Sequence, residues 1–147
     1  MIGKNLRGIT LSAKFFHCLR QFVPSILNKC PPLRVVFFDF GDLFIELPCD
    51  DSAAASDGQS VAKWLFTPLQ NDVLKVLTCQ LNMDGGILAS KIEAVKAAFA
   101  NASSPVNFIV VFWFNRSSFA GSVVPFKLTN EFTHEQLALE RINNGRR

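Results

Sequence analysis

The run LRVVFFDF, residues 33–40, decides the fold prediction for this sequence. It is continuously apolar apart from Arg34 and Asp39, it is rich in β-branched and aromatic residues, and it is bounded by Pro32 and Gly41. An apolar run of this length between Pro and Gly is typical of a strand that is covered on both faces, as strands in parallel sheets usually are. We therefore expect an α/β fold with this strand in its sheet.

Four other segments around this run have clear secondary-structure signals. Residues 106–114 (VNFIVVFWF) form the strongest strand signal, and residues 122–128 predict a second strand that returns beside it as an antiparallel hairpin. Near the start, residues 6–11 predict a short strand. A helix is expected over 13–29, where apolar residues recur at steps of three and four and Pro24 introduces a kink.

The middle of the chain predicts helices. Residues 48–60 are acidic and rich in small residues, which indicates an exposed loop. Residues 61–104 are interpreted as a mostly helical insertion, with a helical stretch over 61–66, a second helix over 67–81 and another over 87–100.

A last helix is expected near the end of the chain. Thr133 stands as its N-cap, Gln136 occupies the capping-box position, and Phe132 is placed to pack on Leu137 as a hydrophobic staple. The predicted order is therefore strand, helix, strand, helical middle, strand, strand, helix.

Length and composition bound the class of protein. The 147 residues are enough for a single domain over 1–147 and exclude two catalytic domains. Hydrophobic residues make up 49% of the chain and charged residues only 18%, against about 25% charged in an average soluble domain. We expect part of this apolar surplus to be buried against a partner.

The charge is unevenly distributed. Lys and Arg total 15 against 12 Asp and Glu, and residues 1–38 contain six cations with no acid before Asp39. This composition fits an organellar import signal, and it equally fits a basic surface on the first helix. No run reaches the roughly 20 apolar residues that a membrane-spanning helix needs.

One segment resembles a catalytic motif. Haloacid-dehalogenase-type phosphatases carry a nucleophilic aspartate after an apolar strand and a second aspartate two residues later. Here Asp39 is followed by Asp42 at three residues, so an extended chain would direct the two side chains to opposite faces. A small phosphatase that uses Asp39 is the third and least favoured functional hypothesis. The four cysteines show no C-x-x-C spacing, and no catalytic, cofactor-binding or metal-binding residue is expected.

A nucleic-acid partner is also weighed. The computed isoelectric point of 8.8 is below the value of about 9 that marks an electrostatic footprint for nucleic acid, and the aromatic run 106–114 has no flanking cations. In a ribosomal setting, the candidate RNA contacts are Lys4, Arg7 and Lys14.

Several local matches suggest a family. The opening KNLRGITL (4–11), RQF (20–22) and PPLRVV (31–36) resemble the thioredoxin-like domain shared by small mitochondrial ribosomal proteins and by an accessory subunit of respiratory complex I, and the segments 123–126 and 132–137 are similar to its closing part. The resemblance implies a thioredoxin-like β-α-β…β-β-α core. It would consist of residues 4–47 and 105–142, with a mixed sheet of about four strands and the helical insertion between the second and third strands.

The same resemblance implies a function. The chain would be a non-catalytic accessory subunit of mitochondrial complex I (NADH:ubiquinone oxidoreductase), on the matrix side, with an uncleaved or internal targeting signal. The alternative is a structural protein of the mitochondrial ribosome with the same fold. Because Trp, Phe and Arg are enriched at protein interfaces, the expected interface residues are Arg20, Phe22, Trp64 and Trp113. The family's cysteine after the first strand is absent, so no redox role or cofactor is carried over.

Overall fold

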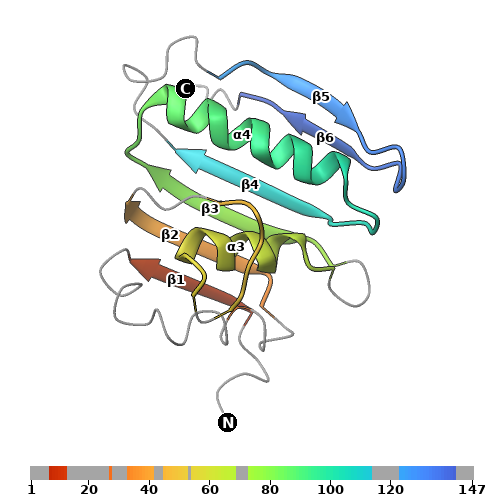
Figure 1. Ribbon diagram of the computed structural model, residues 1–147. Helices are drawn as coiled ribbons and strands as arrows, with labels where there is room; N and C mark the ends of the chain where they lie inside the picture. The colour runs from red at the N-terminus through yellow and green to blue at the C-terminus, as the bar shows by residue number, and fades with distance from the viewer. Residues whose placement is uncertain are drawn as a thin grey trace, which may run out of the picture.

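The computed structural model of the protein describes residues 7–12, 27, 33–41, 45–52, 54–68, 73–113 and 123–141, with only the backbone at 11–12 and 39–41. Two helices and six strands occupy these ranges (Figure 1). In chain order they are β1 (Gly8–Ser12), β2 (Val35–Gly41), α3 (Asp57–Phe66), β3 (Lys75–Leu81), α4 (Gly85–Ala100), β4 (Phe108–Trp113), β5 (Phe126–Thr129) and β6 (Gln136–Leu139).

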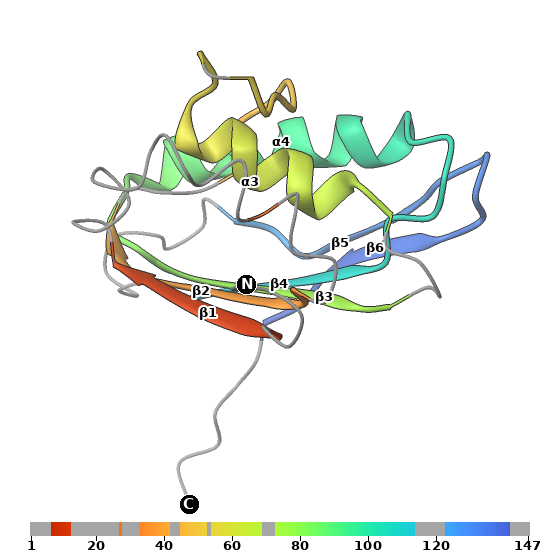
Figure 2. The same ribbon diagram turned by 90° about the horizontal axis from the view of Figure 1, so that it is seen from below.

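The strands form two sheets. The larger sheet has the order β1-β2-β3-β4, and all three neighbouring pairs are parallel. β5 and β6 form a separate antiparallel pair. Parallel neighbours need crossover connections, and crossovers of the same hand between consecutive strands place their helices on one face. Figure 2 shows this arrangement, with α3 and α4 on the same face of the large sheet.

The α/β class is confirmed, and so are several of its elements. Strands occur as β1, β2 and β4 where the runs 6–11, 33–40 and 106–114 predicted them, and α4 matches the helix expected over 87–100. The helix expected over 13–29 lies outside the described residues, apart from Leu27, which is helical and buried.

The pairing of the strands differs from the prediction. We expected one mixed sheet in which 106–114 pairs with 122–128 as an antiparallel hairpin. Instead β4 pairs with β3 in parallel, and β5 takes β6 as its antiparallel partner. The sequence pattern identifies apolar strands, but the choice of partner depends on which crossover helix packs between them.

The helical insertion over 61–104 is wrong in its centre, because residues 75–81 form β3 rather than the second half of a helix. Leu74 and Leu77 suggested helical spacing, yet the buried positions alternate strictly along the strand. Pairing with β2 on one edge and β4 on the other satisfies the backbone of β3 more extensively than an isolated helix would.

The last predicted helix is also wrong, because residues 136–139 form β6. Thr133 does not cap a helix: its Oγ1 accepts from the Glu135 N–H at 3.4 Å within the β5–β6 loop. Phe132 does not staple onto Leu137 but stays 71% exposed. Leu137 and Leu139 are half-buried on one side of the strand, so tertiary packing overrides the helix propensity of this short segment.

A capping box begins α3. The Ser56 Oγ accepts from the Gln59 N–H at 3.1 Å, and the Gln59 side chain accepts from the Ser56 N–H at 3.0 Å. Ser56 Oγ also donates to the Glu46 carboxylate at 2.6 Å. These bonds satisfy the free N–H groups of the first turn, so α3 starts at Asp57, inside the stretch predicted as loop.

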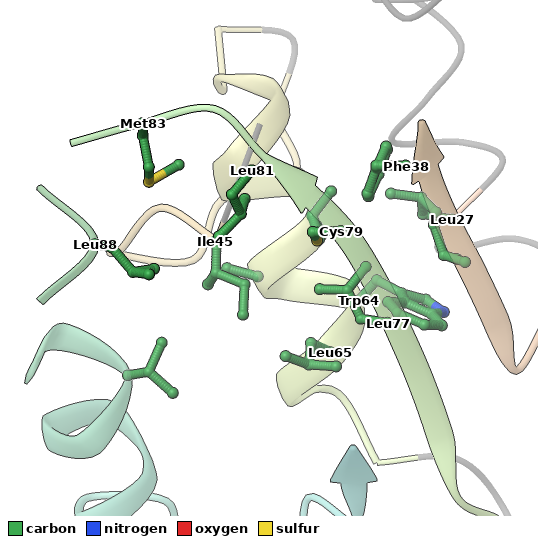
Figure 3. Close-up of a cluster of buried hydrophobic side chains, with 14 of the residues drawn as sticks. Leu27, Phe38, Ile45, Trp64, Leu65, Leu77, Cys79, Leu81, Met83 and Leu88 are labelled. Carbon is green, nitrogen blue, oxygen red and sulfur yellow. The ribbon is translucent and has the colours of Figure 1, made fainter. Parts of the chain in front are cut away.

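The core lies between the helices and the sheet. Figure 3 shows Trp64 and Leu65 of α3 against Leu77 and Cys79 of β3, with Phe38 of β2 beside them. All of these side chains are at most 4% exposed. Burial of large apolar side chains at about 1.5–3 kcal/mol each makes this layer the main source of stability.

A buried lysine closes the end of α3. Lys75 is 1% exposed, and its ammonium donates to the backbone carbonyls of Trp64 and Thr67 and, at 3.3 Å, to that of Leu65. The Nζ also lies 5.6 Å from the centre of the Trp64 ring. The carbonyl end of a helix attracts a cation, so Lys75 joins the start of β3 to the end of α3.

The β5–β6 loop is fastened to the connection between α4 and β4. Asn130 is fully buried, and its amide donates to the carbonyls of Phe99 at 2.6 Å and Ala102 at 2.8 Å. The Glu135 carboxylate accepts from the N–H groups of Val106 at 3.1 Å and Asn107 at 3.2 Å. These side-chain to backbone hydrogen bonds therefore fix the position of the smaller sheet relative to α4 and β4.

The burial of Lys75 makes stability depend on pH. Burial lowers the pKa of Lys75 to about 8, whereas a lysine in an unfolded chain titrates at about 10.4. Between these values the unfolded state binds more protons, so the free energy of unfolding should rise with pH, by up to about 3 kcal/mol. In denaturant titrations from pH 7 to 11, the free energy of unfolding of the native protein minus that of Lys75→Met should rise by this amount, because groups that titrate in both proteins, such as the buried Cys79 thiol with its raised pKa, cancel in the difference. An equal rise in both proteins would assign it to other groups.

Even the isosteric replacement of Asn130 by aspartate should lower the free energy of unfolding. Asn130→Asp would place a carboxylate oxygen against the carbonyls of Phe99 and Ala102, so we expect a loss of roughly 3 kcal/mol of unfolding free energy at pH 7. The matched control is Asn82→Asp, because Asn82 is exposed, and its loss should be below about 0.5 kcal/mol. Equal losses in chemical denaturation would contradict the role of Asn130.

Candidate functional site

The face of the large sheet opposite the helices is the most distinctive surface of the described residues. Side chains alternate between the faces of a strand, so the residues between the core positions point to this face. The strand register aligns them in rows across the sheet. The first row is Gly8, Val35, Val76 and Ile109, and the second is Thr10, Phe37, Thr78 and Val111. Further along the same face of β3 and β4, Gln80 pairs with Trp113.

These rows and the pair of Gln80 and Trp113 are partly open to solvent: half of their residues are exposed, and the others, Phe37, Val76, Thr78, Gln80 and Val111, are half-buried. Val35 is 43% exposed, Ile109 47% and Trp113 51%, and no helix or strand among the described residues lies over them (Figure 2). We expected the strand at 33–40 to be covered on both faces. Its inward residues Val36 and Phe38 are buried, but the other face is not covered by a described element.

A parallel sheet with one face left uncovered by the described helices and strands is unusual. Parallel sheets occur almost only with both faces packed, because their strands are apolar on both sides. Contiguous exposed apolar patches in folded proteins mark protein or ligand contacts. The two rows that cross all four strands, together with Gln80 and Trp113, therefore form a candidate interaction surface, which we call the open face.

The open face is almost uncharged. Its described side chains include no Lys, Arg, Asp or Glu. Contacts with nucleic acid rely on cations that neutralise phosphates. The chemistry of this face is therefore suited to an apolar protein surface.

The predicted interface residues fall in different places. Trp113 lies on the open face and is half-exposed. Trp64 is only 2% exposed and belongs to the core, so its prediction as an interface anchor is wrong: the ring packs between α3 and the sheet. Arg20 and Phe22 lie outside the described residues.

The candidate RNA contacts are only partly described. Arg7 is exposed and directly precedes β1, where its carbonyl accepts from the N–H groups of Arg34 at 2.9 Å and Val35 at 3.1 Å. Lys4 and Lys14 lie outside the described residues, so the structure brings no basic cluster together from this set.

The residues considered for catalysis are not assembled into a site by the described part of the chain. Asp39 belongs to β2, its strand partner in β1 is Ser12, and Asp42 lies outside the described residues. In the described ranges no three His, Cys, Asp or Glu side chains are grouped as a metal site would require. Burial raises the pKa of Cys79 to about 12 and also raises that of Cys49, which keeps both thiols protonated at neutral pH.

A hollow of about 490 Å³ lies between α4 and the start of β5. Lys96 stands at its wall, 2.7 Å from the Glu93 carboxylate and 4.5 Å from the centre of the Phe126 ring. The lysine is thus already paired with an anion and an aromatic face. The hollow presents no unpaired charged group to a ligand.

The fold and the open face together define a class of protein: an α/β protein whose parallel sheet is covered by helices on one face and presents apolar rows on the other. Among the described helices, none is both long and apolar enough to cross a membrane. Comparisons with protein-family models, with curated proteins and with solved structures found no significant match.

Sequence reasoning missed most of the open face. Val35 and Ile109 were assigned only to buried strands, because a continuous apolar run does not reveal which of its faces lacks a cover. The missing signal was the order of the strands in the sheet. When consecutive strands are neighbours and their crossovers have one hand, the crossovers pass over the same face, so the alternate residues of each run are not covered by α3 or α4.

Two lysine substitutions distinguish the faces. Ile109→Lys should change the free energy of unfolding by less than about 1 kcal/mol, because this side chain is already 47% exposed. Leu77→Lys should prevent cooperative folding, because Leu77 is fully buried in the core. Thermal unfolding followed by circular dichroism measures both. Similar losses in the two variants would show that the open face is covered in solution.

Proposed function

We propose that this protein is a non-catalytic binding subunit that joins a larger assembly through the open face of its parallel sheet. The observation that carries the proposal is the pair of apolar rows across four strands, with Val35 and Ile109 each more than two-fifths exposed. A partner with an apolar, weakly charged surface would complete the two-sided burial that parallel strands normally have.

The shape of this face favours a protein partner. Its strands are hydrogen-bonded to one another across the sheet, so little order is lost when a partner packs on it. Trp113 lies at the end of β4 as a large aromatic group, and tryptophan is enriched among the residues that dominate binding energy.

We propose mitochondrial complex I as the assembly and its matrix side as the location. The support is the acid-free basic stretch 1–38, the low charge of the chain and the uncharged rows of the open face. A thioredoxin-like relationship is part of this proposal. Its closing match is weakened because 136–139 is a strand, and its opening match depends partly on residues outside those described.

The alternative proposal is a structural protein of the mitochondrial ribosome. It would use Lys4, Arg7 and Lys14 on RNA, and it differs from the first proposal in its dependence on salt. Binding through phosphate contacts weakens steeply as salt rises from 50 to 200 mM, whereas apolar contact does not.

Sedimentation of tagged protein from mitochondrial extracts tests the proposal. We expect the native chain to migrate with complex I at both low and high salt. At least 90% of the Ile109→Lys variant should instead stay at the top of the gradient, which corresponds to an order-of-magnitude loss of binding. The matched control is Ile87→Lys, because Ile87 is 52% exposed but lies on α4, away from the open face. This variant should sediment like the native chain.

Other outcomes would revise the proposal in defined ways. Salt-sensitive sedimentation with ribosomal particles would favour the alternative. Migration as a free chain in every condition would refute both assemblies. Magnesium-dependent phosphatase activity that Asp39→Asn abolishes would contradict a non-catalytic role.

A further inference from the structure

The tip of the β5–β6 hairpin presents an aromatic side chain to solvent. Phe132 is 71% exposed, the most exposed of the large hydrophobic side chains in the described residues. It stands in the loop 130–135, whose other members are polar: Asn130, Glu131, Thr133, His134 and Glu135. A phenylalanine in this position contributes little to the core, and its ring is available to a partner.

The backbone around Phe132 is held rigidly. The buried Asn130 Oδ1 accepts from the N–H of Phe132 at 2.7 Å and from that of Thr133 at 2.8 Å. The His134 N–H donates to the Asn130 carbonyl at 2.9 Å, and His134 takes the left-handed conformation, φ 60°, that closes the loop. Because the loop is already ordered, little conformational entropy remains to be lost when it binds.

This loop is also fixed relative to the rest of the protein. Through Asn130 and Glu135 it is bonded to the carbonyls that end α4 and to the first N–H groups before β4. Figure 2 shows the hairpin tip beside the α4–β4 connection, on the side of the helices rather than of the open face. The tip is therefore a second surface, separate from the one on which the proposed function rests.

The surroundings of the tip are electronegative. The segments 97–105 and 130–135 contain Glu131 and Glu135 and no Lys or Arg, and α4 has no basic residue in its last turn. The Glu135 carboxylate and the Phe99 and Ala102 carbonyls already accept hydrogen bonds, so the exposed Glu131 carries the negative charge that a partner would meet.

We infer that the hairpin tip is an anchor for a partner protein, with Phe132 inserted into an apolar pocket that has lysines or arginines at its rim. The pocket would bury the ring, and the basic rim would face Glu131. Rigid aromatic side chains in desolvated pockets dominate the energy of many interfaces, while complementary charge at the rim sets the association rate.

Site-specific photo-cross-linking tests this inference. Benzoyl-phenylalanine is placed at position 132 of the full chain in its own cells, and in a parallel strain at Val124. Val124 is the matched control because it is 69% exposed, precedes the same hairpin and lies outside the loop. We expect one defined cross-linked protein from position 132 and none from position 124. Sequencing of the cross-linked peptide should place it beside lysine or arginine residues.

The partner so identified is then purified and its affinity for the full chain is measured. Phe132→Ala should weaken binding at least tenfold, Val124→Ala should leave it unchanged, and Glu131→Lys should weaken it and abolish its decrease with salt. Thermal unfolding should show that all three variants fold. Ile109→Lys should retain the tip cross-link, which separates this inference from the function proposed for the open face.

The inference is overturned by any of four results. These are no cross-link from position 132, equal cross-linking from position 124, a cross-link only to a second copy of this chain, or an affinity that Phe132→Ala does not change. If the cross-linked pocket contains no lysine or arginine, the inference that the rim of the partner's pocket is basic is wrong.

Discussion

β3 is hydrogen-bonded to β2 along one edge and to β4 along the other, and both pairings are parallel. Parallel pairing requires each connection to cross over the sheet, so α3 and α4 both lie where they cover the inward side chains of β3. The core residues Leu77 and Cys79, the buried ammonium of Lys75 and the position of the open face all follow from this one arrangement.

In this parallel sheet, alternate residues of each strand have different roles. Inward residues such as Val36 and Leu77 are completely buried and supply stability, while the residues between them, such as Val35, stay half-exposed and supply a surface. Because the apolar groups on both faces are of similar kind, the sequence of a strand does not distinguish the stabilising face from the binding face. The distinction depends on the helices, which pack against only one of them.

Polar groups complete the structure where apolar packing ends. Lys75 joins β3 to the carbonyl end of α3, and Asn130 with Glu135 joins the small sheet to the end of α4. In each case a side chain from one element satisfies backbone groups of another, which removes the cost of leaving those groups buried without partners. The loop around Phe132 owes its fixed geometry to the second of these junctions.

The sequence by itself determined the strands at 33–40 and 106–114, the helix over 87–100 and the α/β class, because long periodic runs of apolar residues specify their local structure. It also singled out Trp113, which the open face presents. The Ser-x-x-Gln capping box at residues 56–59 is recognisable in the sequence but was not predicted. The similar pattern at Thr133 and Gln136 was predicted to begin a helix, but it lies in the β5–β6 hairpin. Only the tertiary structure decided that residues 75–81 and 136–139 are strands, that Trp64 is buried and that Phe132 is exposed. The physical reason is that these short segments have weak local preferences, so long-range strand pairing and the one-sided helix layer determine their conformation.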